Sequence, residues 1–381
     1  MAVWQQPLGP SYRQASEAEL RDRIGIARQK LGGKLVILGH HYQQDAVVEF
    51  ADFTGDSFEL SRQAAAQKQA QFVIFCGVHF MAESADILTP ENVAVILPDL
   101  GAGCSMADMA NLDQTIECWE QLEEYCPDQT IVPVTYMNSS AAIKSFVGEH
   151  GGAVCTSSNC RSVLEWAMRG GAVEVHRQGR KVKVLFFPDQ HLGRNTAFAL
   201  GYPLDSMVVW DASKDLGGND APRLTDASFV LWKGQCSVHQ LFRPEHVDQV
   251  RRQFPQMKVL VHPECCFEVV QKSDLTGSTA YIVKQIDAAP PGSQWALGTE
   301  VHLINRLAHA HPEQKIIVLS ECQCLCTTMY RIDLPHLCWA IENLAAGNIV
   351  NQIKVDPRTC QWAMVALEHM LAIKASGGPA K

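Results

Sequence analysis

The sequence predicts an α/β protein of three similar three-layer domains, each with a parallel sheet, in a pseudo-threefold arrangement around a central site. Apolar runs of strand length alternate along the chain with amphipathic runs of helix length, a pattern typical of parallel sheets joined by helices. The strand runs are apolar at consecutive positions, as expected for strands covered on both faces. The same order of segments occurs three times, which predicts three domains.

The first domain is expected over residues 13–110. After an N-terminal helix, the apolar run KLVILG leads to His40 and Tyr42, and two further strand runs lead to Cys104, which has glycines close by in GAGC. Two amphipathic segments within 333–375 are expected to form closing helices that join this domain.

The second domain is expected over residues 111–236. Its first strand run ends in Tyr136 and Asn138, and its last strand run, FVLW, is followed by Cys236. The segment near 196–228 does not fit the repeated plan, so we interpret it as an insertion.

The third domain is expected over residues 237–332. The run KVLV leads to His262 and Glu264, and the run KIIVLS leads to Cys326. Each domain therefore opens with a strand that ends in polar residues and closes with a strand that precedes a cysteine. Ligands of open parallel sheets bind outside the carboxyl ends of the strands, so we expect these residues to face one central site.

The three cysteines at the strand ends are expected to hold one iron–sulfur cluster. In a large chain of a reducing compartment, cysteines bind metal or do chemistry more often than they form disulfides. Three ligands leave one iron open to act as a Lewis acid. Redox or inert thiols stay open as an alternative, and so does a zinc site made by Cys322, Cys324 and Cys326 with Cys265 or Cys266. The role of a small buried hydrophobic residue is expected for Cys76, Cys118, Cys338 and Cys360.

Small hydroxyl residues begin three helical segments, in TGDS at 54–57, TSSN at 156–159 and GST at 277–279. Backbone N–H groups at helix starts bind carboxylates and phosphates, so three such motifs at one site favour a polyanionic substrate. Glu264, at a strand end, suits general acid–base catalysis. The sequence has no GxGxxG, P-loop or GxSxG motif, which argues against nucleotide binding and acyl transfer.

Charge and hydropathy exclude other classes. The net charge of −9 argues against a nucleic-acid partner. No apolar run approaches the roughly 18 residues of a membrane helix, and the N-terminus lacks the basic start and apolar middle of a signal peptide. We therefore expect a cytoplasmic protein without a membrane partner.

The motifs, taken in order, resemble those of the quinolinate synthase family over about residues 34–330. They are GHHYQ, GDS, ILPDLGAGCSMADM, VTYMNSSAAIK, VCTSSN, FFPDQHLGRN, WKGQCSVH, HPEC, GST and CLCTTM. The resemblance implies three α/β domains around a central site and a 4Fe-4S cluster with three cysteine ligands. It also implies the condensation of iminoaspartate with dihydroxyacetone phosphate to quinolinate, the precursor of the pyridine ring of NAD.

The resemblance further implies roles for particular residues. The cluster ligands would be Cys104, Cys236 and Cys326, the last because it stands directly before the T-x-M stretch. Tyr42 and Glu264 would transfer protons, with His262 as a third catalytic residue. Substrate contacts would fall on His40, Ser57, Tyr136, Met137, Asn138, Ser157, His262, Pro263, Glu264 and Thr279. The partners would be the two small-molecule substrates. A transient contact with the enzyme that produces iminoaspartate is also compatible with the resemblance.

Two other functions stay open on the residues alone. A cluster-dependent hydro-lyase acting on a small hydroxy acid would share the open iron but would need no phosphate pocket. A thiol sensor or cluster carrier would need the cysteines but neither Tyr42 nor Glu264. The resemblance implies no role for the insertion or for Cys265, Cys266, Cys322 and Cys324, and the CQCLC spacing makes a regulatory disulfide there unexpected.

Overall fold

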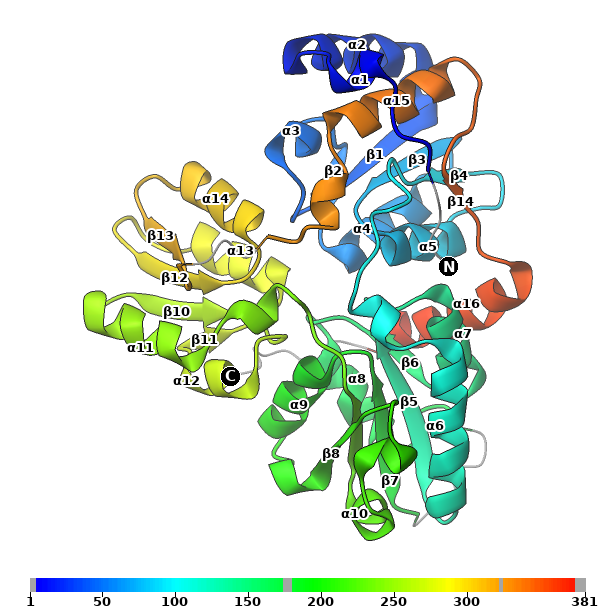
Figure 1. Ribbon diagram of the computed structural model, residues 1–381, viewed down its shortest axis with the longest axis vertical. Helices are drawn as coiled ribbons and strands as arrows, with labels where there is room; N and C mark the ends of the chain where they lie inside the picture. Colours follow the sequence, from blue (N-terminus) through cyan, green and yellow to red (C-terminus); the bar gives the residue numbers. More distant parts are fainter. Residues whose placement is uncertain (1–4, 174–179, 322–324, 374–381) are drawn as a thin grey trace. The chain divides into compact units, whose positions relative to one another are not determined.

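The computed structural model describes residues 5–173, 180–321 and 325–373. The chain forms two compact units, one of Met1–Cys104 with Leu325–Asp356 and one of Ser105–Cys324 with Pro357–Lys381. Three mostly parallel sheets with flanking helices run through the described chain, one in the first unit and two in the second (Figure 1). This confirms the predicted class of three α/β domains.

The first unit holds a five-stranded sheet in the order β14-β4-β3-β1-β2. Its strands are β1 (Leu35–His40), β2 (Phe53–Gly55), β3 (Phe72–Cys76), β4 (Ala94–Ile96) and β14 (Gln352–Ile353). Its helices are α1 (Pro10–Arg13), α2 (Glu17–Leu31), α3 (Asp45–Val48), α4 (Ser57–Ala66), α5 (His79–Leu88) and α15 (Leu334–Ala345), with 3-10 turns η1 (Gly32–Lys34) and η6 (Met329–Arg331). The strands pair in parallel, except that β14 pairs antiparallel with β4.

The second unit holds a five-stranded sheet in the order β6-β5-β7-β9-β8, all parallel. Its strands are β5 (Thr130–Tyr136), β6 (Ala153–Cys155), β7 (Val182–Phe187), β8 (Met207–Trp210) and β9 (Phe229–Trp232). Its helices are α6 (Leu112–Tyr125), α7 (Ala141–Glu149), α8 (Cys160–Ala167), α9 (Gln190–Ala199), α10 (Ala221–Asp226) and α16 (Pro357–Ala372), with 3-10 turns η2 (Ala107–Met109), η3 (Leu204–Ser206) and η4 (Asp215–Gly218).

The third sheet, also in the second unit, has the order β11-β10-β12-β13 and is parallel throughout. Its strands are β10 (Lys258–Val261), β11 (Leu275–Thr276), β12 (Gln294–Gly298) and β13 (Lys315–Val318). Its helices are α11 (Pro244–Gln253), α12 (Phe267–Lys272), α13 (Thr279–Asp287) and α14 (Val301–Ala310), preceded by the 3-10 turn η5 (His239–Leu241).

The three sheets share one strand order. Numbered within each sheet, the first strand lies between the second and the third, and a later strand follows the third. The residues of β1 and β5 are all buried, in agreement with their runs of consecutive apolar residues. Apart from β14, the strands of each sheet fall within one predicted range, and the domain boundaries 13–110, 111–236 and 237–332 stay predictions.

The segment near 196–228 extends the second sheet. It contains β8, which adds an edge strand parallel to β9, and α10, which begins with Asp220 as its N-cap. Without β8, the second sheet would have the same strand order as the third. The extra strand therefore accounts for the departure from the repeated plan.

The two C-terminal helices lie in different units. We expected both to join the first domain, and α15 does lie in the first unit, but α16 lies in the second. The helix α16 packs on α7 at Gly148, where an added Cβ would lie 2.0 Å from the carbonyl oxygen of Trp362. A glycine is needed there because the two backbones approach so closely. Among the described residues, no helix combines the length and the hydrophobicity that crossing a bilayer requires.

A buried lysine links β7 to the segment after β8. Lys183 is fully buried, and its ammonium donates to the carbonyl oxygen of Leu224 at 2.6 Å and to that of Ala227. Burial lowers the pKa of Lys183 to about 8. Burial of the side chain therefore disfavours the charged form of Lys183. The same ammonium is the hydrogen-bond donor to two backbone carbonyls.

Replacing Lys183 by Met should lower the free energy of unfolding by about 2–4 kcal/mol, because two buried carbonyls lose their donor. The loss should grow between pH 8 and pH 10.5, because there the unfolded lysine binds a proton that the folded one has released, so the stability of the wild type rises with pH. Denaturant unfolding across this pH range measures both effects. Lys181→Met, at an exposed lysine that also donates to carbonyls of α10, is the control. A loss that does not change with pH would contradict the lowered pKa.

Candidate active site and cysteine ligands

Polar side chains lie at equivalent strand ends in the three sheets. His40 is the last residue of β1, Tyr136 is the last residue of β5, and His262 directly follows β10. Each of these three strands is the first of its sheet and lies between the second and the third strand. The strand order of the sheet therefore switches sides at this strand. That point is where open parallel sheets bind ligands.

The second strand of each sheet leads to a hydroxyl residue at or near a helix start. Ser57 is the first residue of α4 and Thr279 is the first residue of α13, while Ser157 lies in the loop between β6 and α8. Their neighbours make the capping contacts: Asp56 accepts from the N–H of Glu59, and Ser278 caps α13. The capping role is thus taken by other side chains.

In the first unit, His40 and Tyr42 lie against each other. His40 is buried, and its Nδ1 accepts a hydrogen bond from the backbone N–H of Tyr42 at 3.1 Å. The two rings meet edge to face with centroids 4.8 Å apart, and Tyr42 is only partly buried. The histidine therefore fixes the loop from which the tyrosine ring is presented.

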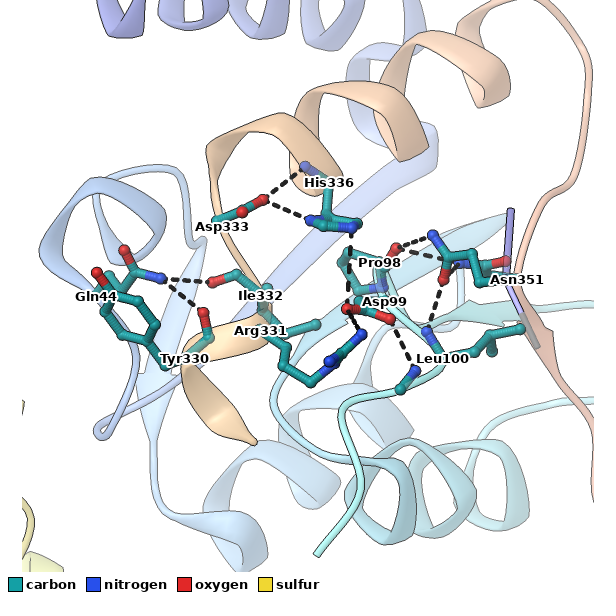
Figure 2. Close-up of polar contacts among 12 residues, drawn as sticks. Gln44, Pro98, Asp99, Leu100, Tyr330, Arg331, Ile332, Asp333, His336 and Asn351 are labelled. Carbon is teal, nitrogen blue, oxygen red and sulfur yellow. Dashed lines mark hydrogen bonds and ion pairs between the residues drawn. The ribbon is translucent and has the colours of Figure 1, made fainter. Parts of the chain in front are cut away.

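The loop of Tyr42 is bound to the segment that follows Cys326. Gln43 donates to the carbonyl of Met329, and Gln44 donates to the carbonyls of Tyr330 and Ile332 at 3.0 and 3.1 Å. Figure 2 shows the Gln44 side chain reaching across to this segment. Hydrogen bonds from two glutamine side chains to backbone carbonyls thus hold the loop of Tyr42 against the segment that follows Cys326.

Asp99 ties the loop of Cys104 to the same segment. Its carboxylate accepts from the N–H of Gly101 at 2.8 Å and pairs with the Arg331 guanidinium at 2.9 Å (Figure 2). A Cβ on Gly101 would lie 2.7 Å from that guanidinium. Gly101 therefore makes room for Arg331, so that the loops carrying Cys104 and Cys326 are joined within one unit.

Replacing Asp99 by Ala should lower the free energy of unfolding by about 1–3 kcal/mol. The carboxylate is buried and accepts from a backbone N–H, which loses its partner in the variant; the half-exposed Arg331 adds little. Thermal unfolding measured by circular dichroism tests this. Asp22→Ala, at an exposed position of α2, should leave the midpoint unchanged, and an equal shift in both variants would contradict a special role for Asp99.

The candidate ligand cysteines differ from most others in exposure. Cys104, Cys236 and Cys326 are each half-buried. The buried cysteines are Cys76, Cys118, Cys126, Cys155, Cys160, Cys265 and Cys338. Burial raises the pKa of Cys76 to about 12 and that of Cys338 to about 11, so these two thiols stay protonated, whereas a metal ligand must be a thiolate.

Within the described parts of the chain, two further cysteines are half-buried, Cys266 and Cys360. The expectation of full burial is therefore wrong for Cys360, which sits near the start of α16, and right for Cys76, Cys118 and Cys338. The zinc alternative with Cys322 and Cys324 falls outside the described residues. Cys104 and Cys326 belong to the first unit and Cys236 to the second, and their convergence on one cluster stays a prediction.

In the second unit, Glu264 lies between two histidines. One of its carboxylate oxygens, Oε2, is 3.1 Å from Nδ1 of His239 and 3.1 Å from Nδ1 of His262. The two imidazole rings stack with centroids 4.5 Å apart, and all three side chains are at most 3% exposed. Burial opposes ionisation of Glu264, but the two neighbouring histidines outweigh it and lower the pKa of Glu264.

The segment PDQHLGRN contributes residues that the sequence reasoning did not single out. Asn195 donates to the carbonyls of Pro263 and Cys265 at 2.8 and 2.9 Å and so holds the loop of Glu264. Asp189 is fully buried and caps α9 through the N–H groups of His191 and Leu192. Burial and the nearby Glu264 raise the pKa of Asp189. The pKa values of these two buried carboxyl groups are therefore shifted in opposite directions.

His239 was also missed, although the sequence carries a signal for it. It lies three residues after Cys236 in CSVH, and the backbone bond from Gln240 N–H to the Cys236 carbonyl closes a turn between them. The Cys236 sulfur, a His239 nitrogen and a Glu264 oxygen all lie within 4.8 Å of one another. The C-x-x-H spacing on a turn could have predicted that Cys236 and His239 lie together, but not that Glu264 joins them.

The remaining predicted contact residues in this unit differ in exposure. Tyr136, Met137, Pro263 and Thr279 are buried, whereas Asn138 and Ser157 are half-buried. Close by, Lys144 is fully buried and donates to the carbonyl of Ser139. The assignment of these residues to substrate contacts stays a prediction.

Comparison with known proteins gives one family. The profile described as "Quinolinate synthetase A protein" matches residues 24–372. A quinolinate synthase of Corynebacterium glutamicum is 53% identical over 369 residues, which cover 97% of this chain and 91% of that protein. The quinolinate synthase of Rhodopirellula baltica is 50% identical, with coverage of 97% and 94%, and that of Acidobacterium capsulatum is 54% identical, with 95% of each chain covered. The chain therefore belongs to the quinolinate synthetase A protein family.

Proposed function

We propose that this chain is a quinolinate synthase, which condenses iminoaspartate with dihydroxyacetone phosphate and releases phosphate and water. The names of its relatives support the activity. The observation that carries the proposal is the buried Glu264 between His239 and His262 with the Cys236 sulfur beside it. A candidate acid–base group and a candidate cluster ligand thus lie side by side in one unit.

The cofactor of this proposal is a 4Fe-4S cluster held by Cys104, Cys236 and Cys326. Two features support the fit: the three cysteines are all half-buried, and Asp99 joins the loops of Cys104 and Cys326 within the first unit. When bound, a cluster with three cysteine ligands supplies an open iron that acts as a Lewis acid on a substrate oxygen or nitrogen.

The residues around the site would bind and orient the substrates. Together the substrates carry two carboxylates and a phosphate, and the helix starts at Ser57 and Thr279 offer backbone N–H groups and hydroxyls to such anions. Further contacts would come from His40, Tyr136, Met137, Asn138, Ser157, His262 and Pro263.

Tyr42 and Glu264 would move the protons. The condensation and the dehydrations need a group that takes a proton from carbon and a group that gives one to a departing oxygen. Glu264 is a buried carboxylate at a strand end, held by His239 and His262, so it suits the base. Tyr42 is partly exposed on a loop that His40 fixes, so it suits the acid. The quinolinate would serve NAD biosynthesis in the cytoplasm, with a transient contact to the enzyme that supplies iminoaspartate.

The test is turnover by anaerobically purified protein. We expect quinolinate from iminoaspartate and dihydroxyacetone phosphate together, and none when the phosphate compound is left out. Turnover of a hydroxy acid that does not need dihydroxyacetone phosphate would favour a hydro-lyase instead. Protein that makes no quinolinate but passes its cluster to an acceptor would be a carrier and would overturn the proposal.

A further inference from the structure

Cys236, His239 and Glu264 offer three different metal ligands at one point. Their sulfur, nitrogen and oxygen atoms all lie within 4.8 Å of one another. His239 and Glu264 are almost fully buried, and Cys236 is half-buried. The thiolate and imidazole of this set favour zinc, iron or cobalt over the oxygen-preferring magnesium and calcium ions.

The contact between His239 and Glu264 has the geometry of two ligands that share a cation. Nδ1 of His239 lies 3.1 Å from Oε2 of Glu264, yet Nδ1 makes no hydrogen bond among the described residues. Two ligands at about 2.0–2.1 Å from one tetrahedral metal ion are about 3.3 Å apart. The separation therefore matches shared coordination as well as it matches an ion pair.

Two further features favour a ligand at this point. Oε1 of Glu264 is buried and has no hydrogen-bond partner in the described chain. On the other side of the imidazole, Nε2 of His239 lies 3.5 Å from the hydroxyl of the buried Thr299. Metal-binding histidines usually have such an outer partner, which holds the proton on the far nitrogen and leaves the near one to the metal.

We propose that Cys236, His239 and Glu264 bind one divalent transition-metal ion, Zn²⁺ or Fe²⁺, in the chain that has not received its cluster. Three protein ligands leave a fourth position for water, as in catalytic zinc sites. The binding itself does not depend on the proposed function. One consequence does rest on it: because the cluster also requires Cys236, the single ion and the cluster exclude each other.

The first experiment uses Co²⁺ as the probe. The full-length protein is freed of metal under anaerobic conditions and titrated with Co²⁺, whose thiolate ligand gives a near-ultraviolet charge-transfer band. We expect one Co²⁺ per chain with this band. Cys236→Ser should remove the band, and His239→Gln and Glu264→Gln should each weaken binding at least tenfold.

Two matched variants separate this site from the cluster. Cys104→Ser and Cys326→Ser remove cluster ligands but leave the three proposed groups untouched, so they should bind Co²⁺ as the wild type does. Circular dichroism verifies that each variant is folded. A band that survives in Cys236→Ser, a band that disappears in Cys104→Ser or Cys326→Ser, or the absence of stoichiometric binding to folded wild type would overturn the proposal.

The second experiment tests the exclusion. Wild-type protein loaded with one Zn²⁺ should take up iron and sulfide much more slowly than metal-free protein, and a chelator should restore the rate. His239→Gln should be slowed far less by Zn²⁺. Equal rates with and without Zn²⁺ in the wild type would overturn the exclusion. If no cluster forms in any sample, the proposed cofactor fails while the Co²⁺ result stands on its own.

Discussion

Cys104→Ser should abolish both the cluster and the formation of quinolinate. A cluster held by three cysteines loses a third of its protein ligands, and a serine hydroxyl does not replace a thiolate on iron. Anaerobically purified wild type should be brown and hold about four irons per chain, whereas the variant should be nearly colourless. Iron analysis and the visible spectrum measure the cluster, and turnover measures the activity.

Cys360→Ser is the matched control for this result. Cys360 is half-buried, as Cys104 is, but it lies at the start of α16 and has no ligand role in the proposal. The control should keep its colour, its iron and its turnover. If Cys104→Ser retained a full complement of iron, or if both variants lost it, the three-cysteine assignment would be wrong.

Strand runs could be predicted from the sequence because their information is local. Consecutive apolar residues in KLVILG and TIVPVT favour strands covered on both faces, and β1 and β5 are indeed buried throughout. The repeated order of runs and polar ends then predicted three α/β domains. The edge strand β8 was missed because a four-residue run, MVVW, is too short to show a period.

Contacts across long sequence distances could not be predicted in the same way. A side chain at Gly101 would meet Arg331, which lies 230 positions later. The helix α16 has an amphipathic pattern, yet nothing in that pattern says that α7 is its partner. In both cases the packing partner is distant in the sequence and becomes a neighbour only in the folded chain.

The candidate site contains residues of both kinds, some that could be predicted from the sequence and some that could not. Glu264 could be singled out because a carboxylate at a strand end, in an HPE motif, is a plausible acid–base group. His239 could not be matched to it, since the two residues lie on different segments and meet only when η5 packs beside the end of β10. Asn195, which holds the Glu264 loop through two carbonyls, was hidden for the same reason.

Glu264→Gln should lower kcat by about 10²–10⁴ while the cluster is retained. The amide keeps the size of the carboxylate and can still contact His239 and His262, but it cannot accept a proton, and general acid–base catalysis contributes about this factor. The substrate KM should change little, because the side chain acts on the reacting atoms more than on the bound ground state. Steady-state kinetics and iron content, measured on the same anaerobic sample, test both statements.

Glu268→Gln is the matched control for Glu264→Gln. Glu268 is exposed at the start of α12, four residues away, and its variant should keep wild-type kcat and iron. A wild-type kcat in Glu264→Gln would show that the carboxylate is structural, although it is buried between two histidines. A loss of iron together with kcat would instead show that the variant disturbs the cluster through Cys236, which lies within 4.8 Å of the Glu264 carboxylate. Only a loss of kcat with iron retained assigns proton transfer to Glu264.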